Sequence, residues 1–172
     1  MKTLIHILFF LLSCGAFAAS PSSAIITHQR WGNLDQVTQY GQFYFSAAPD
    51  ENALAEFKKR GGQAVVDLRT TKEMDCSELA VATKLGLKYQ NIQFKKAEPI
   101  NKAVIAQIEK AVADSKGASI LLHCETGNRA AAWLAIHLVT QDKMKPKEAL
   151  SIAEEVGLRS ADLKTKVGTY LK

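Results

Sequence analysis

The ten residues Ile120-Leu121-Leu122-His123-Cys124-Glu125-Thr126-Gly127-Asn128-Arg129 decide the fold of this chain. The apolar run Ser119–His123 predicts a strand buried in the middle of a sheet. The nearly all-apolar segment Arg129–Thr140 predicts a buried helix. A short turn that begins with Cys124 joins the two. Because open α/β sheets bind ligands at the carboxyl ends of their strands, we expect a functional site at this turn.

Strands and helices alternate on both sides of this junction. The other predicted strands are Gln42–Ser46, Ala64–Leu68 and Tyr89–Phe94, and the other predicted helices are Asp50–Arg60, Ser77–Leu85, Asn101–Ala113, Pro146–Val156 and Ser160–Leu171. Ser20–Gly41 shows no strong periodicity, so we expect an irregular lead-in there. The alternation predicts one α/β domain of three layers, in which helices flank a central, mostly parallel sheet.

The turn after the central strand contains the groups that bind an oxyanion. Its backbone amides can point inward as a nest, and the following helix adds its positive end. Gly127 permits a tight backbone, and Arg129 offers a planar fork for two oxygens. The same positive field stabilises a thiolate at Cys124, which makes it a nucleophile suited to phosphorus or sulfur. The predicted phosphate-binding loop comprises Glu125, Thr126, Gly127, Asn128 and Arg129.

Composition places the chain among ordinary globular proteins. It has 172 residues, of which 47% are hydrophobic and 23% charged, so it can bury a core and is not disordered. The formal charge of +5 is mild, and no run of basic residues exceeds three. We therefore expect no nucleic-acid partner. The three cysteines are too few for a disulfide scaffold.

Residues 1–19 have the pattern of a secretory signal. A lysine at position 2 precedes an apolar run, and Ala16 and Ala18 flank Phe17 as in an ordinary cleavage site. We expect export, most simply to a bacterial periplasm, which leaves a mature α/β domain over residues 20–172. Leu11-Leu12-Ser13-Cys14 also resembles a lipobox, so lipidation at Cys14 is an alternative that would add a membrane anchor.

The Cys–Arg loop between an apolar strand and a buried helix resembles the phosphate loop of cysteine-dependent protein tyrosine and dual-specificity phosphatases. The order of QFYFSAAP (42–49), GGQAVVDLR (61–69), GLKYQNI (86–92) and HCETGNRAAA (123–132) is similar to that of small bacterial members. These include the phosphatase-like domain of the beta-lactamase hydrolase-like family. The resemblance implies a phosphatase-like α/β domain in which Cys124 is the nucleophile, Arg129 binds phosphate and His123 orients the loop. It also implies that neither a metal nor another cofactor takes part.

Three features depart from that family's pattern. Four residues separate Cys124 and Arg129 where the family usually has five. Ala130 stands where a Ser or Thr usually donates a hydrogen bond to the departing thiolate, and Thr126 is a possible replacement. The loop that normally supplies an aspartic acid as proton donor holds Glu98 instead, with Glu73 and Asp75 as further candidates.

The sequence leaves other functions open. A rhodanese-type sulfurtransferase also has four residues between its Cys and Arg, and it would carry sulfur as a persulfide of Cys124. A third possibility is a binding module for phosphate or sulfate without turnover. Cys76 could form a disulfide with Cys124 in an oxidising compartment and so switch off the nucleophile. Asp67 and Arg69 could form a structural pair, or Arg69 could add positive charge near the substrate.

Overall fold

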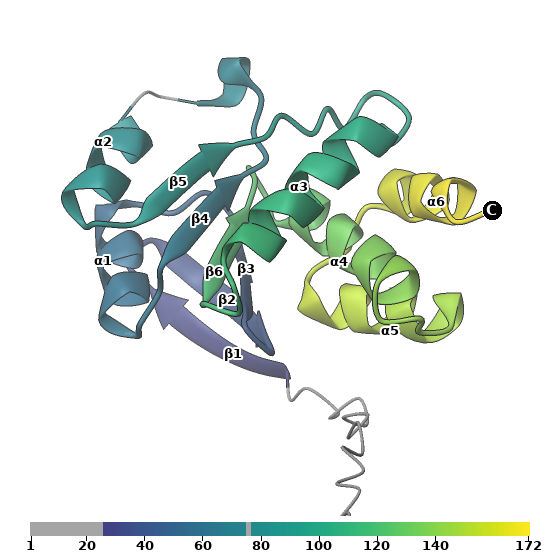
Figure 1. The fold of residues 1–172 in the computed structure, drawn as a ribbon, viewed down its shortest axis with the longest axis horizontal. Helices are drawn as coiled ribbons and strands as arrows, with labels where there is room; N and C mark the ends of the chain where they lie inside the picture. The colour runs from purple at the N-terminus through teal and green to yellow at the C-terminus, as the bar shows by residue number, and fades with distance from the viewer. Residues whose placement is uncertain (1–25, 75–76) are drawn as a thin grey trace, which may run out of the picture.

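The computed structural model describes residues 26–74 and 77–172 of the chain. Its centre is one sheet of six strands in the order β1-β2-β3-β6-β4-β5 (Figure 1). The strands are β1 (Ile26–Trp31), β2 (Leu34–Tyr40), β3 (Phe43–Ser46), β4 (Ala64–Asp67), β5 (Lys88–Asn91) and β6 (Ile120–His123). β3, β6, β4 and β5 are parallel, and β1 and β2 add an antiparallel edge. The predicted α/β class with a mostly parallel central sheet is confirmed.

Side chains of the three central strands alternate between two apolar cores, because successive residues of a strand point to opposite faces. One core receives Phe43, Phe45, Val66, Ile120 and Leu122. The other core receives Tyr44, Val65 and Leu121. Both faces are therefore buried, which explains why these strands appear in the sequence as continuous apolar runs rather than as alternating patterns.

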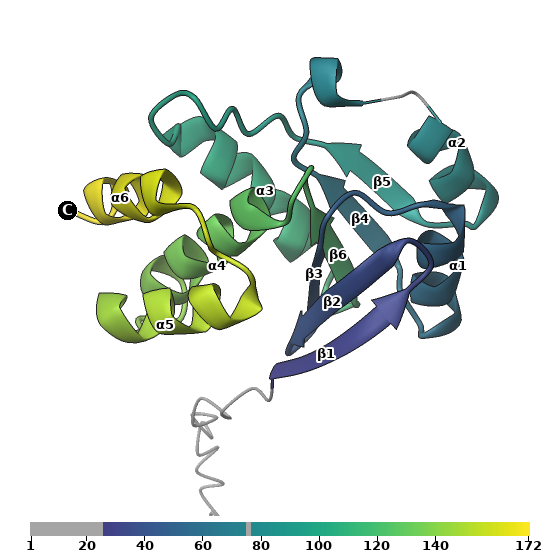
Figure 2. The same cartoon turned by 180° about the vertical axis from the view of Figure 1, so that it is seen from behind.

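The helices are α1 (Glu51–Lys59), α2 (Ser77–Lys84), α3 (Lys102–Asp114), α4 (Asn128–Thr140), α5 (Pro146–Val156) and α6 (Ala161–Tyr170), with a 3-10 turn at Thr71–Glu73. Figures 1 and 2 show α1 and α2 on one side of the sheet and α3 to α6 on the other. α5 and α6 both contact α4. Among the described residues, no helix combines the length and the apolar character needed to cross a membrane.

Capping side chains set the starts of three helices. Asp50 accepts a hydrogen bond from the Ala53 amide before α1, and Asn101 accepts one from the Ala103 amide before α3, as its position predicts. Ser160 caps α6 through the amide of Leu163. The predicted helices agree with the observed ones to within one residue at each end.

The segment before Tyr40 is not an irregular lead-in, because its described part forms the hairpin of β1 and β2. The apolar residues Leu34 and Val37 are three apart, which breaks the two-residue period of a strand. A register shift between Gln29 and Trp31 disturbs β1 as well. The hairpin is fixed by tertiary packing, since Trp31 stacks on Phe57 of α1 with ring centroids 6.0 Å apart.

β5 also differs from its prediction, because it ends at Asn91 and not at Phe94. Ile92 and Phe94 are buried, and this apolar character extends the pattern beyond the strand. Their amides still donate to the carbonyls of Asp67 and Leu68 at 2.8 and 3.1 Å. The residues after β5 therefore stay hydrogen-bonded to the end of β4, although they do not continue the regular strand pairing.

Trp31→Ala should lower the free energy of unfolding by about 3–5 kcal/mol, because it removes a large side chain that is 2% exposed. Urea unfolding would measure this loss as a lower midpoint concentration, with an unchanged dependence of the free energy of unfolding on urea concentration. Leu79→Ala is the control, since Leu79 is 53% exposed and should change stability by less than about 0.5 kcal/mol. Equal effects of the two substitutions would contradict a structural role for the hairpin.

Candidate active site

β6 and the turn after it place two neighbouring residues on opposite sides of the sheet. Cys124 belongs to the core on the side of α3 and α4, where it is a free thiol with no exposed surface. His123 lies on the side of α2, next to Glu78. In register, His123 is level with Ser46 of β3 and Asp67 of β4, so all three strands end at this point. The sheet therefore separates the thiol from the imidazole.

The turn after Cys124 brings Gly127 against the end of β3. Gly127 has a φ of +81°, and a Cβ there would lie 3.3 Å from the carbonyl oxygen of Ser46. In the described part of the chain, the amides of residues 125–127 donate to no protein acceptor. The first amides of α4, which begins at Asn128, also lack acceptors within the helix. These donors are available to an anion.

Asn128 fastens this loop to the turn between α5 and α6. Its Oδ1 accepts hydrogen bonds from the amides of Arg159 and Ser160 at 2.7 and 2.8 Å. Its Nδ2 donates to Oγ1 of Thr126 at 3.1 Å. Because Ser160 caps α6, Asn128 fixes the first turn of α6 beside the phosphate-binding loop.

Arg129 connects the loops that follow three parallel strands. Its Nη1 donates to the carbonyls of Leu68 and Phe94 at 3.0 and 2.9 Å. Nη1 and Nη2 also hold the two carboxylate oxygens of Glu73 at 3.0 and 2.7 Å. The pairing with Glu73 uses the side of the guanidinium formed by Nη1 and Nη2. The other edge, formed by Nε and Nη2, has no further oxygen acceptor among the described residues. That edge can bind two phosphate oxygens.

The same ion pair fixes the charge of Glu73. Burial alone raises its pKa, but hydrogen bonds from Arg129 and Thr70 outweigh burial and lower the pKa to about 2. Burial lowers the pKa of Arg129, and the interactions with Glu73 and Cys124 outweigh that effect and raise it. The sequence offers Glu73 as an acid candidate, but this carboxylate is ionised at neutral pH. It has no proton to donate to a leaving group.

A buried cluster of charged side chains lies behind the loop on the α2 side. The Nε and Nη2 of Arg69 donate to Asp67 at 3.0 and 2.8 Å, and Nη2 also donates to Glu78 of α2. Of the two roles open to Arg69, this structural pairing is the one observed, since Arg69 is buried. Although burial raises the pKa of Asp67, the hydrogen bonds from Arg69 outweigh it and lower the pKa.

His123 completes this cluster. Its Nε2 lies 2.8 Å from Oε1 of Glu78, although the two atoms lack the angle of a hydrogen bond. One donor atom each from Asp67, Glu78 and His123 lies within 4.8 Å of the others, a spacing that could hold a metal ion. The Arg69 guanidinium already supplies positive charge to both carboxylates. The cluster therefore has the character of a structural support for the end of β6.

Two cavities border the phosphate-binding loop, and both are lined by Glu125, Thr126 and Asn128. The smaller one has a volume of about 140 Å³ and reaches Arg129. The larger one, about 600 Å³, lies between β2, the end of β3 and the turn after α5, and does not reach Arg129. The smaller cavity is thus the place where an anion would meet the guanidinium. Cys124 lines neither cavity and lies beneath the loop surface.

The remaining predicted residues lie apart from this centre or outside the described residues. Glu98 is exposed, forms an ion pair with Lys95 at 3.0 Å and lines neither cavity beside the loop. Its role as proton donor stays a prediction. Asp75 and Cys76 lie outside the described residues, so a disulfide between Cys76 and Cys124 also stays a prediction.

Three residues near the loop were not expected from the sequence. Lys96 and Asp162 line the smaller cavity, and Glu78 supports His123. Asp162 follows a serine cap, so in the sequence it resembles an acidic residue that only favours a helix start. Glu78 has the same ambiguity in α2, and Lys96 lies in a basic, exposed segment. Only the tertiary structure brings them to the site.

Comparison with known proteins places the chain in a family. A family model described as "DSP-PTPase phosphatase fused to NAD+ Kinase" matches residues 21–167. The beta-lactamase hydrolase-like protein of Xylella fastidiosa (strain Temecula1) is 28% identical over 117 residues, which cover 65% of this chain. The match covers 27% of that protein, so the chain spans about a quarter of the length of this curated relative.

Solved structures share the fold at low identity. Tk-PTP in its active form has a TM-score of 0.66 and 22% identity, with 76% of this chain and 91% of that chain covered. Pseudomonas aeruginosa TpbA in complex with pTyr has a TM-score of 0.65 and 16% identity, with 90% and 91% covered. The catalytic domain of the PP-IP phosphatase SIW14 from Saccharomyces cerevisiae has a TM-score of 0.65 and 15% identity, with 76% and 81% covered.

Stability should fall as the pH drops from about 4.5 to 2, because protonation of Glu73 removes its pairing with Arg129. Folding lowers the pKa of Glu73. The pairing therefore stabilises the native state fully when the pH is above the ordinary pKa of 4.5, and this stabilisation is lost as the pH falls toward the folded-state pKa of about 2. Glu73→Gln should flatten the pH dependence of urea unfolding in this range. Glu98→Gln is the exposed control and should leave the slope unchanged. A wild-type slope in Glu73→Gln would contradict the pairing.

Proposed function

This chain belongs to the family described as "DSP-PTPase phosphatase fused to NAD+ Kinase", and on that basis we propose that it hydrolyses phosphate monoesters through a phosphocysteine on Cys124. The observation that carries the proposal is the edge of Arg129 formed by Nε and Nη2, which has no further protein oxygen as acceptor among the described residues and lies beside the Cys124 thiol and a loop with unpaired amides. Such a group of donors matches the oxygens of a phosphoryl group.

In the first step, the Cys124 thiolate attacks phosphorus in line with the leaving oxygen. The S–P bond forms as the P–O bond breaks, and the electron pair moves to the leaving oxygen. Arg129 and the amides of residues 125–129 hold the other phosphoryl oxygens, where negative charge lies in the transition state. Water then attacks the phosphocysteine, which releases phosphate and regenerates the thiolate. These steps use only groups of the chain and water.

The substrate is a phosphorylated protein or small molecule in this proposal. Lys96 adds positive charge at the smaller cavity, which favours entry of a phosphate dianion. The larger cavity gives room for the organic part of the substrate, and its walls combine polar side chains such as Asn33, Gln36 and Thr38 with apolar ones. The structural relatives include one in complex with pTyr and one described as a PP-IP phosphatase, so both classes belong in a substrate screen.

Two other functions share part of this geometry. A rhodanese-type sulfurtransferase would use the same four-residue spacing between Cys124 and Arg129 to carry a persulfide. A binding module would hold phosphate or sulfate without turnover. Membership of a phosphatase family favours hydrolysis over both.

Cys124→Ser should abolish release of phosphate from p-nitrophenyl phosphate, because a serine hydroxyl is a far weaker nucleophile than a thiolate. The variant should still bind phosphate, measured by calorimetry, since the amides and Arg129 remain. Wild-type protein should form no thiocyanate from thiosulfate and cyanide. Thiocyanate formation without phosphate release would establish the sulfurtransferase, and anion binding without either reaction would establish the binding module.

We also propose that the chain is exported and loses its first residues, as the pattern in residues 1–19 suggests. When the full chain is expressed in a Gram-negative bacterium, the protein should appear in the periplasmic fraction. Its mass should correspond to cleavage at Ala18 or Ala19, and a lipid on Cys14 would instead give a larger mass in the membrane fraction. Full-length protein in the cytoplasm would contradict export.

A further inference from the structure

The proposed reaction needs a group that accepts a proton from the attacking water, and the loop after β5 contains no aspartate. Among the described residues, Glu73 is held by Arg129 and Glu98 lies away from the smaller cavity. Two carboxylates remain beside that cavity, Glu125 and Asp162. The choice between them depends on how each is held.

Two independent contacts hold the start of α6 and the Asp162 side chain beside the cavity. Asn128 of the phosphate-binding loop binds the amide of Ser160, which fixes the first turn of α6. Lys166, one turn later, donates to Oδ2 of Asp162 at 2.8 Å and to the carbonyl of Lys96 at 2.6 Å. Lys166 therefore ties Asp162 to the loop after β5, where the family places its catalytic aspartic acid.

Glu125 lacks comparable support. It is exposed, lines both cavities and has no side-chain partner within the described ranges. A catalytic carboxylate must keep a defined position relative to the reacting atoms. A carboxylate held in this position can accept a proton from water, which is the transfer that hydrolysis of the phosphocysteine needs.

We propose that Asp162 is the general base for hydrolysis of the phosphocysteine, an inference that rests on the proposed function. As the water oxygen bonds to phosphorus, one water proton moves to the Asp162 carboxylate. The S–P bond breaks, and its electron pair returns to Sγ of Cys124 as the thiolate. Asp162 then passes the proton to the departing phosphate or to solvent, so the charge and the atoms balance.

The test uses p-nitrophenyl phosphate, because its leaving group departs without a proton and the first step then needs no acid. Asp162→Asn should keep the initial burst of p-nitrophenolate, about one per active site, and should lower steady-state turnover about 100-fold. The phosphocysteine should accumulate and be visible by mass spectrometry of the quenched protein. Asp162→Glu, which keeps a carboxylate, should recover part of the turnover.

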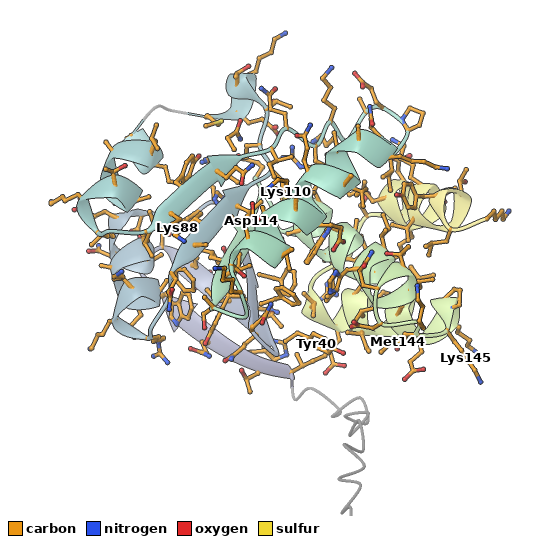
Figure 3. The ribbon with its side chains drawn as sticks, viewed as in Figure 1. Tyr40, Lys88, Lys110, Asp114, Met144 and Lys145 are labelled. Atoms are coloured by element: carbon orange, nitrogen blue, oxygen red, sulfur yellow. The ribbon has the colours of Figure 1, made fainter. Side chains whose placement is uncertain are left out.

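Asp114→Asn is the matched control. Asp114 pairs with Lys110 four residues earlier at 2.6 Å, and its side chain is 64% exposed against 65% for Asp162. Figure 3 shows this pair on α3, and neither residue lines a cavity beside the phosphate-binding loop. Asp114→Asn should turn over like wild-type protein, which shows that loss of one exposed carboxylate alone does not slow the reaction.

Suppose that the wild-type protein releases phosphate and that this release depends on Cys124. Two results would then overturn the role of Asp162 and leave the proposed function intact. One is wild-type turnover in Asp162→Asn. The other is a slowed burst in that variant, which would assign Asp162 to the first step. Absence of phosphate release from wild-type protein would instead reject the proposed function, and the inference with it.

Discussion

The buried guanidinium of Arg129 is the constraint on which the site depends. Its side chain is almost without solvent contact, so the charge must be satisfied within the protein. It is satisfied by the Leu68 carbonyl and the Glu73 carboxylate in the loop after β4 and by the Phe94 carbonyl after β5. The loops at the carboxyl ends of the parallel strands are therefore held around one cation. The same arrangement leaves the edge formed by Nε and Nη2 without a further protein oxygen as acceptor among the described residues.

The neighbouring residues His123 and Cys124 lie on opposite faces of the sheet and have different surroundings. Cys124 lies with the apolar core under α4, and His123 meets the charged cluster of Asp67, Arg69 and Glu78. The cluster thus supports the end of β6 from the face of the sheet opposite the thiol. In contrast, Asn128 connects the loop after Cys124 directly to the start of α6.

The sequence was sufficient for the local parts of this arrangement. The apolar strand, the turn and the apolar helix around Cys124 follow from composition over a few residues, as does the cap at Asn101. The β1–β2 hairpin was missed because its apolar residues break the strand period and Trp31 is fixed by α1. Glu73 could not be assigned to Arg129, nor Asp162 to the cavity, since both depend on how distant segments pack. An ionisable side chain in a loop gives no local sign of its partner.

The hydrogen bonds of Arg129 also bear on how the protein folds. They join residues separated by 61, 56 and 35 positions in the chain. Contacts of that range require the intervening chain to be ordered first, since closing long loops costs entropy before the contact forms. The helices can form from nearby residues, whereas the contacts around Arg129 exist only when the parallel strands are assembled. We therefore expect the contacts of Arg129 to form at the end of refolding, after secondary structure has already returned.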